Sequence, residues 1–338
     1  MGQQQVLEDT VAELIEDGKG ILAADESAPT IAKRFSAVGV ESTEEKRREY
    51  RSLIFSTPGL GDYISGVILY EETLRQSSLD NIAIPELLRN QGIVPGIKVD
   101  KGKIPLVNAP GDEITVGLDG LEERLQGYRD QGARFAKWRD VYHITDTNPG
   151  RLAIEANAEV LARYAAICQS LGVVPIVEPE VLMDGHHTIE RCAQVNEAVL
   201  REVFHALDRH GVLLEGMLLK PSMVTAGKSH TSKASPEQVA EATLKVFRRV
   251  VPAAVPGVVF LSGGQTPEEA TSNLNALNQH GPHPWALSFS YGRALQEPAQ
   301  KAWAGSLENG PAAQEAMHKR AKLNGVARNG SYTPDMER

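Results

Sequence analysis

The sequence predicts an α/β fold, a single (β/α)8 (TIM) barrel, on two observations. Eight short apolar runs with strand composition recur along the 338 residues, each followed by a longer segment with helical periodicity or polar composition. No linker, low-complexity tract, repeat or second compositional zone divides the chain. Regular strand-then-helix alternation gives a parallel sheet, and eight such units favour closure. A doubly wound open sheet is the alternative, but no Gly-x-Gly-x-x-Gly or Walker-type loop supports it.

In chain order, the predicted strands span residues 20–25, 64–71, 94–100, 135–144, 174–181, 216–223, 258–263 and 285–293. Helices between them have start signals: capping boxes begin at Ser42, Ser235 and Thr266, the last two with proline at the first helical position. The segment from Ala294 is typical of one or two helices. We therefore expect a barrel domain over residues 1–328, including extra C-terminal helices, and a short polar tail over residues 329–338.

Composition and charge restrict the function. The chain is 41% hydrophobic and 23% charged, with a net charge of −9, so a large core is possible and neither nucleic acid nor an anionic membrane is the expected partner. Two cysteines, Cys168 and Cys192, lie in helix-like segments and indicate buried thiols in a reducing compartment. Since no signal, transit or membrane-spanning segment is visible, we expect a cytoplasmic protein.

Several predicted strands carry charges where a parallel sheet should be apolar on both faces. Residues two apart share a strand face, so each charged pair should point to the barrel axis while a neighbouring apolar residue faces the helices. The pairs are Lys98 with Asp100, Lys137 with Arg139, and Glu178 with Glu180, and the apolar neighbours expected to face the helices are Val99, Trp138 and Val177; Asp25 and Lys220 join the charged set. Any one could be a solvated loop residue, but together they predict an active site at the C-terminal ends of the strands.

Lys220 stands alone in the apolar run from Gly216 to Val224 and is followed by Pro221. A buried ammonium is costly, which favours the neutral amine, and a neutral amine attacks carbonyl carbons. The proline should end the strand and leave the lysine at its mouth. The sequence thus predicts a Schiff-base lysine, with a lysine that reaches solvent from the strand end as the alternative.

Two loops predict a phosphate site. Ser262, Gly263 and Gly264 directly precede the helix that starts at Thr266, and Ser290 and Arg293 end the eighth strand. Adjacent glycines expose backbone N–H groups, a helix start favours anions, and arginine offers a bidentate fork. The loops after strands seven and eight are where barrels of this kind bind phosphate.

A second basic group, formed by Arg34, Lys98 and Arg139, could bind another anion across the barrel mouth. For Lys33 and Arg34, a solvated helix face is the alternative. No metal site is predicted, because His186 and His187 lie in a polar loop without a helical partner and are taken as surface residues.

Seven motifs together resemble the class I fructose-bisphosphate aldolase family over residues 18–324. They begin at Gly18 (GKGILAADES), Gly96 (GIKVDKG), Phe135 (FAKWR), Val174 (VPIVEPE), Leu218 (LLKP), Leu261 (LSGGQ) and Ser290 (SYGRAL). The resemblance implies a cofactor-free barrel enzyme that cleaves fructose 1,6-bisphosphate to dihydroxyacetone phosphate and glyceraldehyde 3-phosphate in glycolysis and gluconeogenesis. It also implies a homotetramer.

The resemblance assigns roles by motif. Lys220 resembles the Schiff-base lysine, Glu178 the acid/base for imine formation, and Asp25 and Lys137 its electrostatic partners in carbon–carbon cleavage; Glu180 joins the catalytic set. Phosphate at C1 is expected on Ser262, Gly263, Gly264, Ser290 and Arg293 with Arg34 nearby, and the other end of the substrate on Ser27, Lys98 and Arg139.

Three departures from the family's motifs are visible. Pro29 replaces a glycine, Ser222 stands where asparagine is usual, and the residues after Tyr332 do not end in the family's tyrosine. Tyr332 is therefore not expected to carry the proton to C3. The alternatives to the bisphosphate enzyme are a lysine-dependent aldolase that prefers fructose 1-phosphate and a catalytically silent phosphosugar-binding scaffold.

Overall fold

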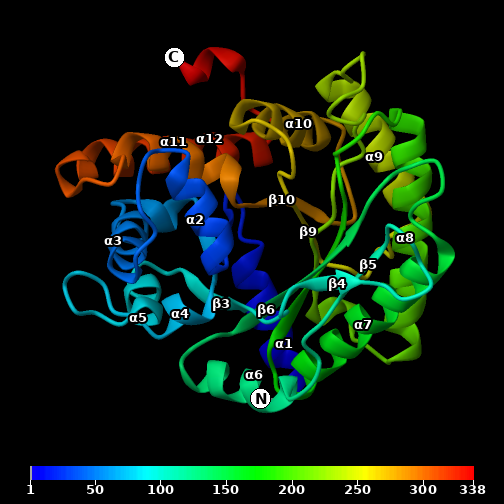
Figure 1. The fold of residues 1–338 in the computed structure, drawn as a ribbon, viewed down its shortest axis with the longest axis horizontal. Coiled ribbons are helices and arrows are strands. Elements are labelled where there is room, and N and C mark those ends of the chain that lie inside the picture. Colours follow the sequence, from blue (N-terminus) through cyan, green and yellow to red (C-terminus); the bar gives the residue numbers. More distant parts are fainter. Residues whose placement is uncertain (1) are drawn as a thin grey trace.

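The computed structural model describes residues 2–338 and confirms the predicted barrel. Eight parallel strands close in sequence order, and the last one pairs with the first. A ring of helices surrounds them (Figure 1). Each strand overlaps its predicted range; the bounds are β1 (Gly20–Ala24), β2 (Ile64–Leu69), β3 (Val94–Lys98), β6 (Phe135–Tyr142), β7 (Val174–Val181), β8 (Leu218–Leu219), β9 (Gly257–Phe260) and β10 (Ala286–Tyr291).

The helices occupy the segments between the strands, and the two predicted C-terminal helices are α11 and α12. In Figure 1, α10, α11 and α12 lie together, with the C-terminal turn beyond them. The bounds are α2 (Ala28–Ser36), α3 (Glu44–Phe55), α4 (Glu71–Leu74), α5 (Ile84–Arg89), α6 (Leu121–Asp130), α7 (Arg151–Ser170), α8 (Ile189–Arg209), α9 (Pro236–Val250), α10 (Pro267–Gln279), α11 (Arg293–Trp303) and α12 (Gly310–Arg328). None of the helices within residues 2–338 is long and apolar enough to cross a bilayer.

Two of the three predicted capping boxes are confirmed. The Ser235 and Thr266 side chains each accept from the backbone of the third helical residue, whose own side chain bonds back to the cap. The box at Ser42 is wrong by one residue. Helix α3 starts at Glu44, so Thr43 is the cap and its hydroxyl accepts from the Lys46 N–H at 3.1 Å.

The sequence analysis did not predict helix α1 (Gln3–Leu14) or the short antiparallel pair β4 (Lys103–Pro105) and β5 (Glu113–Thr115). In α1, Leu7, Val11 and Leu14 pack in one buried cluster with residues at the starts of strands, among them Phe135. Helix α1 therefore covers the N-terminal end of the barrel. The Phe135 ring fills the interior there so closely that a Cβ on Gly96 would overlap it.

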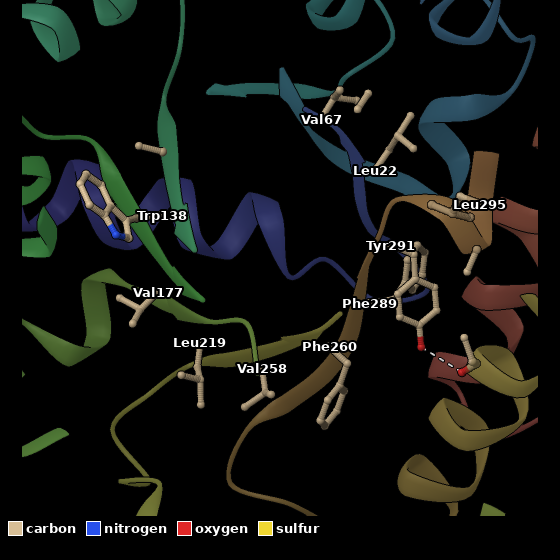
Figure 2. Packing of buried hydrophobic residues seen from close by; sticks show 14 of the residues in the cluster. Leu22, Val67, Trp138, Val177, Leu219, Val258, Phe260, Phe289, Tyr291 and Leu295 are labelled. Carbon is tan, nitrogen blue, oxygen red and sulfur yellow. Dashed lines mark hydrogen bonds between the residues drawn. The ribbon is translucent and has the colours of Figure 1, made fainter. Parts of the chain in front are cut away.

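The outer face of the sheet forms the main core with the helices, as Figure 2 shows for Leu22, Val67, Trp138 and Val177. The Trp138 ring lies 5.6 Å from the ring of Tyr164 on α7. Trp138 and Val177 thus face the helices, as does Val99, which belongs to the same cluster. The prediction that Val99, Trp138 and Val177 face the helices is confirmed.

The last helix is tied to the first strand at its end. Arg328, buried at the C-terminus of α12, donates from its guanidinium to the main-chain carbonyls of Ile15, Glu16 and Lys19, which connect α1 to β1. Lys19 also accepts from the Ser288 hydroxyl of β10 at 2.8 Å. The C-terminal end of α12 is therefore held against the segment that leads into β1, at the edge where β1 pairs with β10.

Asp140 of β6 is a buried carboxyl group on the helix-facing side of the sheet. It is fully enclosed, and its Oδ1 accepts from Trp138 Nε1 at 3.1 Å. Burial raises the pKa of Asp140 well above its ordinary value, against hydrogen bonds from Thr115 and Trp138 that lower it. The folded protein therefore keeps Asp140 protonated in a pH range where the unfolded chain ionises it.

We expect Asp140→Asn to stabilise the protein increasingly as pH rises. Above a pH of about 4 the unfolded state loses the Asp140 proton and the folded state does not, so stability falls by up to about 1.4 kcal/mol per pH unit until the folded pKa is reached. Asparagine keeps the acceptor for Trp138 and removes this dependence. Unfolding free energies of both proteins between pH 5 and 8 measure the effect, and parallel curves would contradict it.

Candidate active site

Lys220 lies at the end of β8, inside the barrel mouth. Its main-chain N–H donates to Val177 O at 2.8 Å, and Pro221 follows without an N–H. The lysine side chain is 4% exposed. The apolar run therefore ends as predicted, but the lysine does not reach solvent from the strand end.

Four charged side chains from four strands form a chain of alternating sign. Glu178 Oε1 lies 3.1 Å from Lys220 Nζ, and its Oε2 lies 3.0 Å from Lys137 Nζ. Lys137 Nζ in turn lies 2.8 Å from Asp25 Oδ2. Glu178 and Lys137 are as buried as Lys220, so each charge is compensated by its neighbour instead of by water.

This arrangement fixes the protonation states of Asp25 and Lys137. Burial by itself raises the pKa of Asp25, but Lys137, Lys220 and Lys98 outweigh it and hold that pKa below its ordinary value. Burial likewise lowers the pKa of Lys137, and the carboxylates of Asp25 and Glu178 outweigh it and raise that pKa. At neutral pH Asp25 is therefore an anion and Lys137 a cation.

The second predicted basic group is also paired with acids. Lys98 Nζ lies 2.5 Å from Asp100 Oδ1, and Arg139 Nε bonds Glu180 Oε2. Although burial lowers the pKa of Arg139, the carboxylate of Glu180 raises it above its ordinary value. The first pair lies at the end of β3, and the second joins the neighbouring strands β6 and β7. Lys98 and Arg139 each keep further N–H donors for a ligand.

The first of the two predicted phosphate loops lies beside Glu180. A Cβ on Gly263 would lie 2.6 Å from Glu180 Oε1, and Gly264 has φ +79°, so both positions require glycine. Ser262 is nearly buried, and the enclosed hydroxyl of Ser290 has no hydrogen-bond partner among residues 2–338. An unpartnered hydroxyl of this kind can bond a ligand oxygen.

Arg34, Ser27 and Arg293 lie farther out. Arg34 forms an ion pair with buried Glu26, and the Ser27 hydroxyl lies 3.1 Å from the Thr30 hydroxyl. Arg293 is exposed, and its Nη2 donates to Gln265 O at 3.1 Å. It lines a cavity of about 820 Å³ between α9, α10 and α11 that Lys220 does not line.

Asp100 was predicted to face the barrel axis but, like Glu26, was given no catalytic or binding role. Each sits one or two residues from an assigned residue, and the structure gives each a direct bond to a predicted site cation. For Asp100 the shared strand face was the signal. Glu26 faces the opposite side from Asp25, so the alternation along the strand could not predict its partners on the helices.

The remaining predicted features lie outside this cluster. Tyr332 is buried against α10, and its hydroxyl donates to Glu337 Oε1 at 2.9 Å. His187 is half-buried, and both its ring nitrogens are enclosed and lack a partner among the residues that the structure describes, so its description as a surface residue is wrong. Across residues 2–338, no three or more histidine, cysteine or acidic side chains are grouped to hold a metal ion.

Chemically, the cluster offers an amine beside a buried carboxyl group, a fixed cation and a fixed anion. An amine and a proton donor within 3.1 Å suit carbonyl condensation. The cation and anion beside them can stabilise charge that develops on a bound substrate.

Comparisons with known proteins identify the family. A family model described as fructose-bisphosphate aldolase class-I matches residues 6–338. A non-muscle fructose-bisphosphate aldolase of Lethenteron camtschaticum is 53% identical over 334 residues, covering 98% of this chain and 92% of the relative. Cytosolic fructose-bisphosphate aldolase 4 of Arabidopsis thaliana is 54% identical over 321 residues, covering 95% of this chain and 82% of the relative.

A solved structure agrees with the sequence matches. The aldolase of Plasmodium falciparum, crystallised with TRAP and a small-molecule inhibitor, superposes with a TM-score of 0.97 at 52% identity, covering 98% of this chain and 96% of that one. With the barrel and its lysine–carboxylate cluster described above, these matches show that the chain belongs to the class I fructose-bisphosphate aldolase family.

Proposed function

We propose that Lys220 forms the Schiff base through which this aldolase reversibly cleaves fructose 1,6-bisphosphate to dihydroxyacetone phosphate and glyceraldehyde 3-phosphate, in glycolysis and gluconeogenesis. The observation that carries this assignment is the buried Lys220 amine 3.1 Å from the buried carboxyl group of Glu178, which Lys137 holds on its other side. Of the other lysines in the site, Lys137 contacts two carboxylates, which raise its pKa and hold it as a cation, and Lys98 donates to both the main-chain and a carboxylate oxygen of Asp100.

The proposed reaction begins when the Lys220 nitrogen attacks C2 of the substrate. Glu178 donates a proton to the carbinolamine oxygen, water leaves, and an iminium forms. Asp25, held ionised, takes the proton of the C4 hydroxyl as the C3–C4 bond breaks. The bonding electrons pass into the iminium and leave an enamine on Lys220, while Lys137 stabilises the charge that moves.

We propose that two groups of residues hold the phosphates. Backbone N–H groups at Gly263 and Gly264, the hydroxyls of Ser262 and Ser290, and Arg293 with Arg34 nearby would bind the 1-phosphate. The start of α10 behind that loop supports an anion there. Ser27, Lys98 and Arg139 would bind the other end, and Glu180 contributes through its ion pair with Arg139.

Borohydride trapping tests the assignment of Lys220. Reduction of the protein with dihydroxyacetone phosphate should add one three-carbon phosphate adduct to the peptide that contains Lys220. Glu178→Gln should form the adduct more slowly because the carbinolamine loses its proton donor. An adduct on the peptide of Lys98 or Lys137 would contradict the proposal.

Three further proposals rest on the family. We propose a cytoplasmic location, as for the cytosolic relative from Arabidopsis thaliana, a homotetrameric assembly, and a division into a barrel domain of residues 1–328 and a tail of residues 329–338. Light scattering of the purified protein measures the assembly. Turnover of fructose 1-phosphate against the bisphosphate distinguishes the main alternative substrate, and absent turnover of both would favour the silent scaffold.

A further inference from the structure

Behind the proposed phosphate site lies a buried network that the reaction above does not use. Its centre is Glu26, the residue after Asp25, which is 6% exposed. Two arginines and a glutamine from three helices converge on it: Arg34 of α2, Arg51 of α3 and Gln296 of α11. Asp25 points to the barrel axis and Glu26 to the helices, so the end of β1 contributes one carboxylate to the active site and the next to this buried network.

Arg51 and Gln296 fix the position of Glu26. Arg51 Nη2 donates to Glu26 O at 3.0 Å and lies 3.6 Å from its Oε2, while Nη1 bonds Thr73 Oγ1. Gln296 Nε2 donates both to Glu26 Oε1 and to Ala23 O, each at 2.8 Å. Since Arg51 is completely enclosed, neither its charge nor that of Glu26 is solvated by water, and each depends on the other.

Arg34 is the outward end of the network. Its Nη1 bonds Glu26 Oε1, and its Nη2 lies beside Gly292, where an added Cβ would be 3.8 Å away. Gly292 precedes Arg293 at the start of α11 and comes two residues after Ser290, whose hydroxyl has no partner in the described part of the chain. With one edge of its guanidinium held by Glu26, Arg34 presents the other edge to the phosphate loop.

We propose that Glu26 is a positioning residue for phosphate binding: with Arg51 and Gln296 behind it, it orients Arg34 toward the Gly292 loop. This inference rests on the proposed function in taking that loop as a phosphate site. Two guanidinium groups share one carboxylate, so the network keeps a net positive charge. Loss of the carboxylate charge would leave Arg34 and Arg51 to repel each other, and the partly exposed Arg34 would be the one to move into solvent.

Glu26→Gln tests the proposal, with Glu49→Gln as the matched control. Glu49 is a similarly buried carboxylate on α3, paired with Lys46 and Trp303 Nε1, and within residues 2–338 it bonds none of Glu26, Arg34, Arg51 and Gln296. The probe is inorganic phosphate as a competitive inhibitor. We expect Glu26→Gln to raise the phosphate Ki and the bisphosphate KM by about fivefold to twentyfold, the loss typical of a misplaced charged hydrogen bond, with kcat within about twofold. Glu49→Gln should lower the melting temperature without changing Ki.

A double mutant distinguishes the orientation of Arg34 by Glu26 from a general destabilisation of the fold. In an Arg34→Ala background, Glu26→Gln should add less than about twofold to Ki, because the residue that it orients is absent. An equal effect in both backgrounds, a Ki that stays the same or falls, or a loss confined to kcat would overturn the proposal. Borohydride labelling of the Glu26→Gln variant tests the proposed function independently. An adduct on a residue other than Lys220 would contradict the Schiff-base assignment, whereas the Ki values alone decide the role of Glu26.

Discussion

Replacing Lys220 by methionine is expected to reduce kcat by at least about 10⁵-fold, because the covalent route through an iminium disappears and nothing else in the site can accept the electrons of the C3–C4 bond. Methionine has a similar length and suits the apolar surroundings of β8. Glu178 keeps its contact with Lys137 at 3.0 Å, so no buried carboxylate is left without a cation. Steady-state cleavage of fructose 1,6-bisphosphate measures the loss.

The same variant carries its own control. Phosphate inhibition and the circular dichroism spectrum should match those of the unmodified protein, since the phosphate loops and the fold do not depend on Lys220. Residual activity within about a hundredfold of the unmodified enzyme would mean that another amine forms the imine.

Replacing Lys137 by methionine should reduce both turnover and stability. Lys137 is the one described cation that contacts both Asp25 and Glu178, so its removal leaves two buried carboxylates to share Lys220. Breaking a buried pair in this way costs about 3–5 kcal/mol of unfolding free energy, and losing a fixed charge beside the reacting atoms costs about 10³-fold in kcat. Lys46→Met, which removes a cation from buried Glu49, is the matched control and should leave kcat unchanged.

The pH dependence of stability gives a second measurement on this variant. In the unmodified protein the depressed pKa of Asp25 contributes stability that is complete above the ordinary carboxyl pKa of about 4 and is lost as pH falls toward the folded pKa. Without Lys137, burial dominates and the pKa of Asp25 rises. Acid unfolding followed by circular dichroism should therefore begin at a higher pH in Lys137→Met, and an unchanged acid limb would show that Lys137 does not hold Asp25 ionised.

The sequence predicted the inner face of the site because a strand has a period of two. Lys137 and Arg139, or Glu178 and Glu180, had to share a face, and an adjacent apolar residue, Trp138 or Val177, indicated which face it was. The contacts between strands could not be predicted in the same way, because they depend on barrel stagger. The contacts of Glu178 with both Lys220 and Lys137 could therefore be learned only from the structure.

The outward-facing charges were missed for the same reason. Asp140 follows Arg139 and Glu26 follows Asp25, so each falls on the helix face of the sheet. Asp140 bonds Trp138 of its own strand, whereas the partners of Glu26 come from other elements, such as Arg51 of α3. Helix α1 did leave a signal in the spacing of Leu7, Val11 and Leu14, but the three-residue strands β4 and β5 are too short to show an alternation.

The clamp of Arg328 on the segment before β1 bears on how the chain is made. The hydroxyl of Ser288 and the carbonyl of Lys19 that it bonds are 269 residues apart, and Arg328 reaches Glu16 across 312. At a translation rate of about 5–20 residues per second, β1 leaves the ribosome roughly 15–50 s before β10. Throughout that interval one edge of a fully apolar strand is open, and such edges pair with other chains. Until synthesis has passed Tyr291, β1 can therefore pair only with β2, its other neighbour in the barrel, and its open edge is an aggregation risk for the newly made chain.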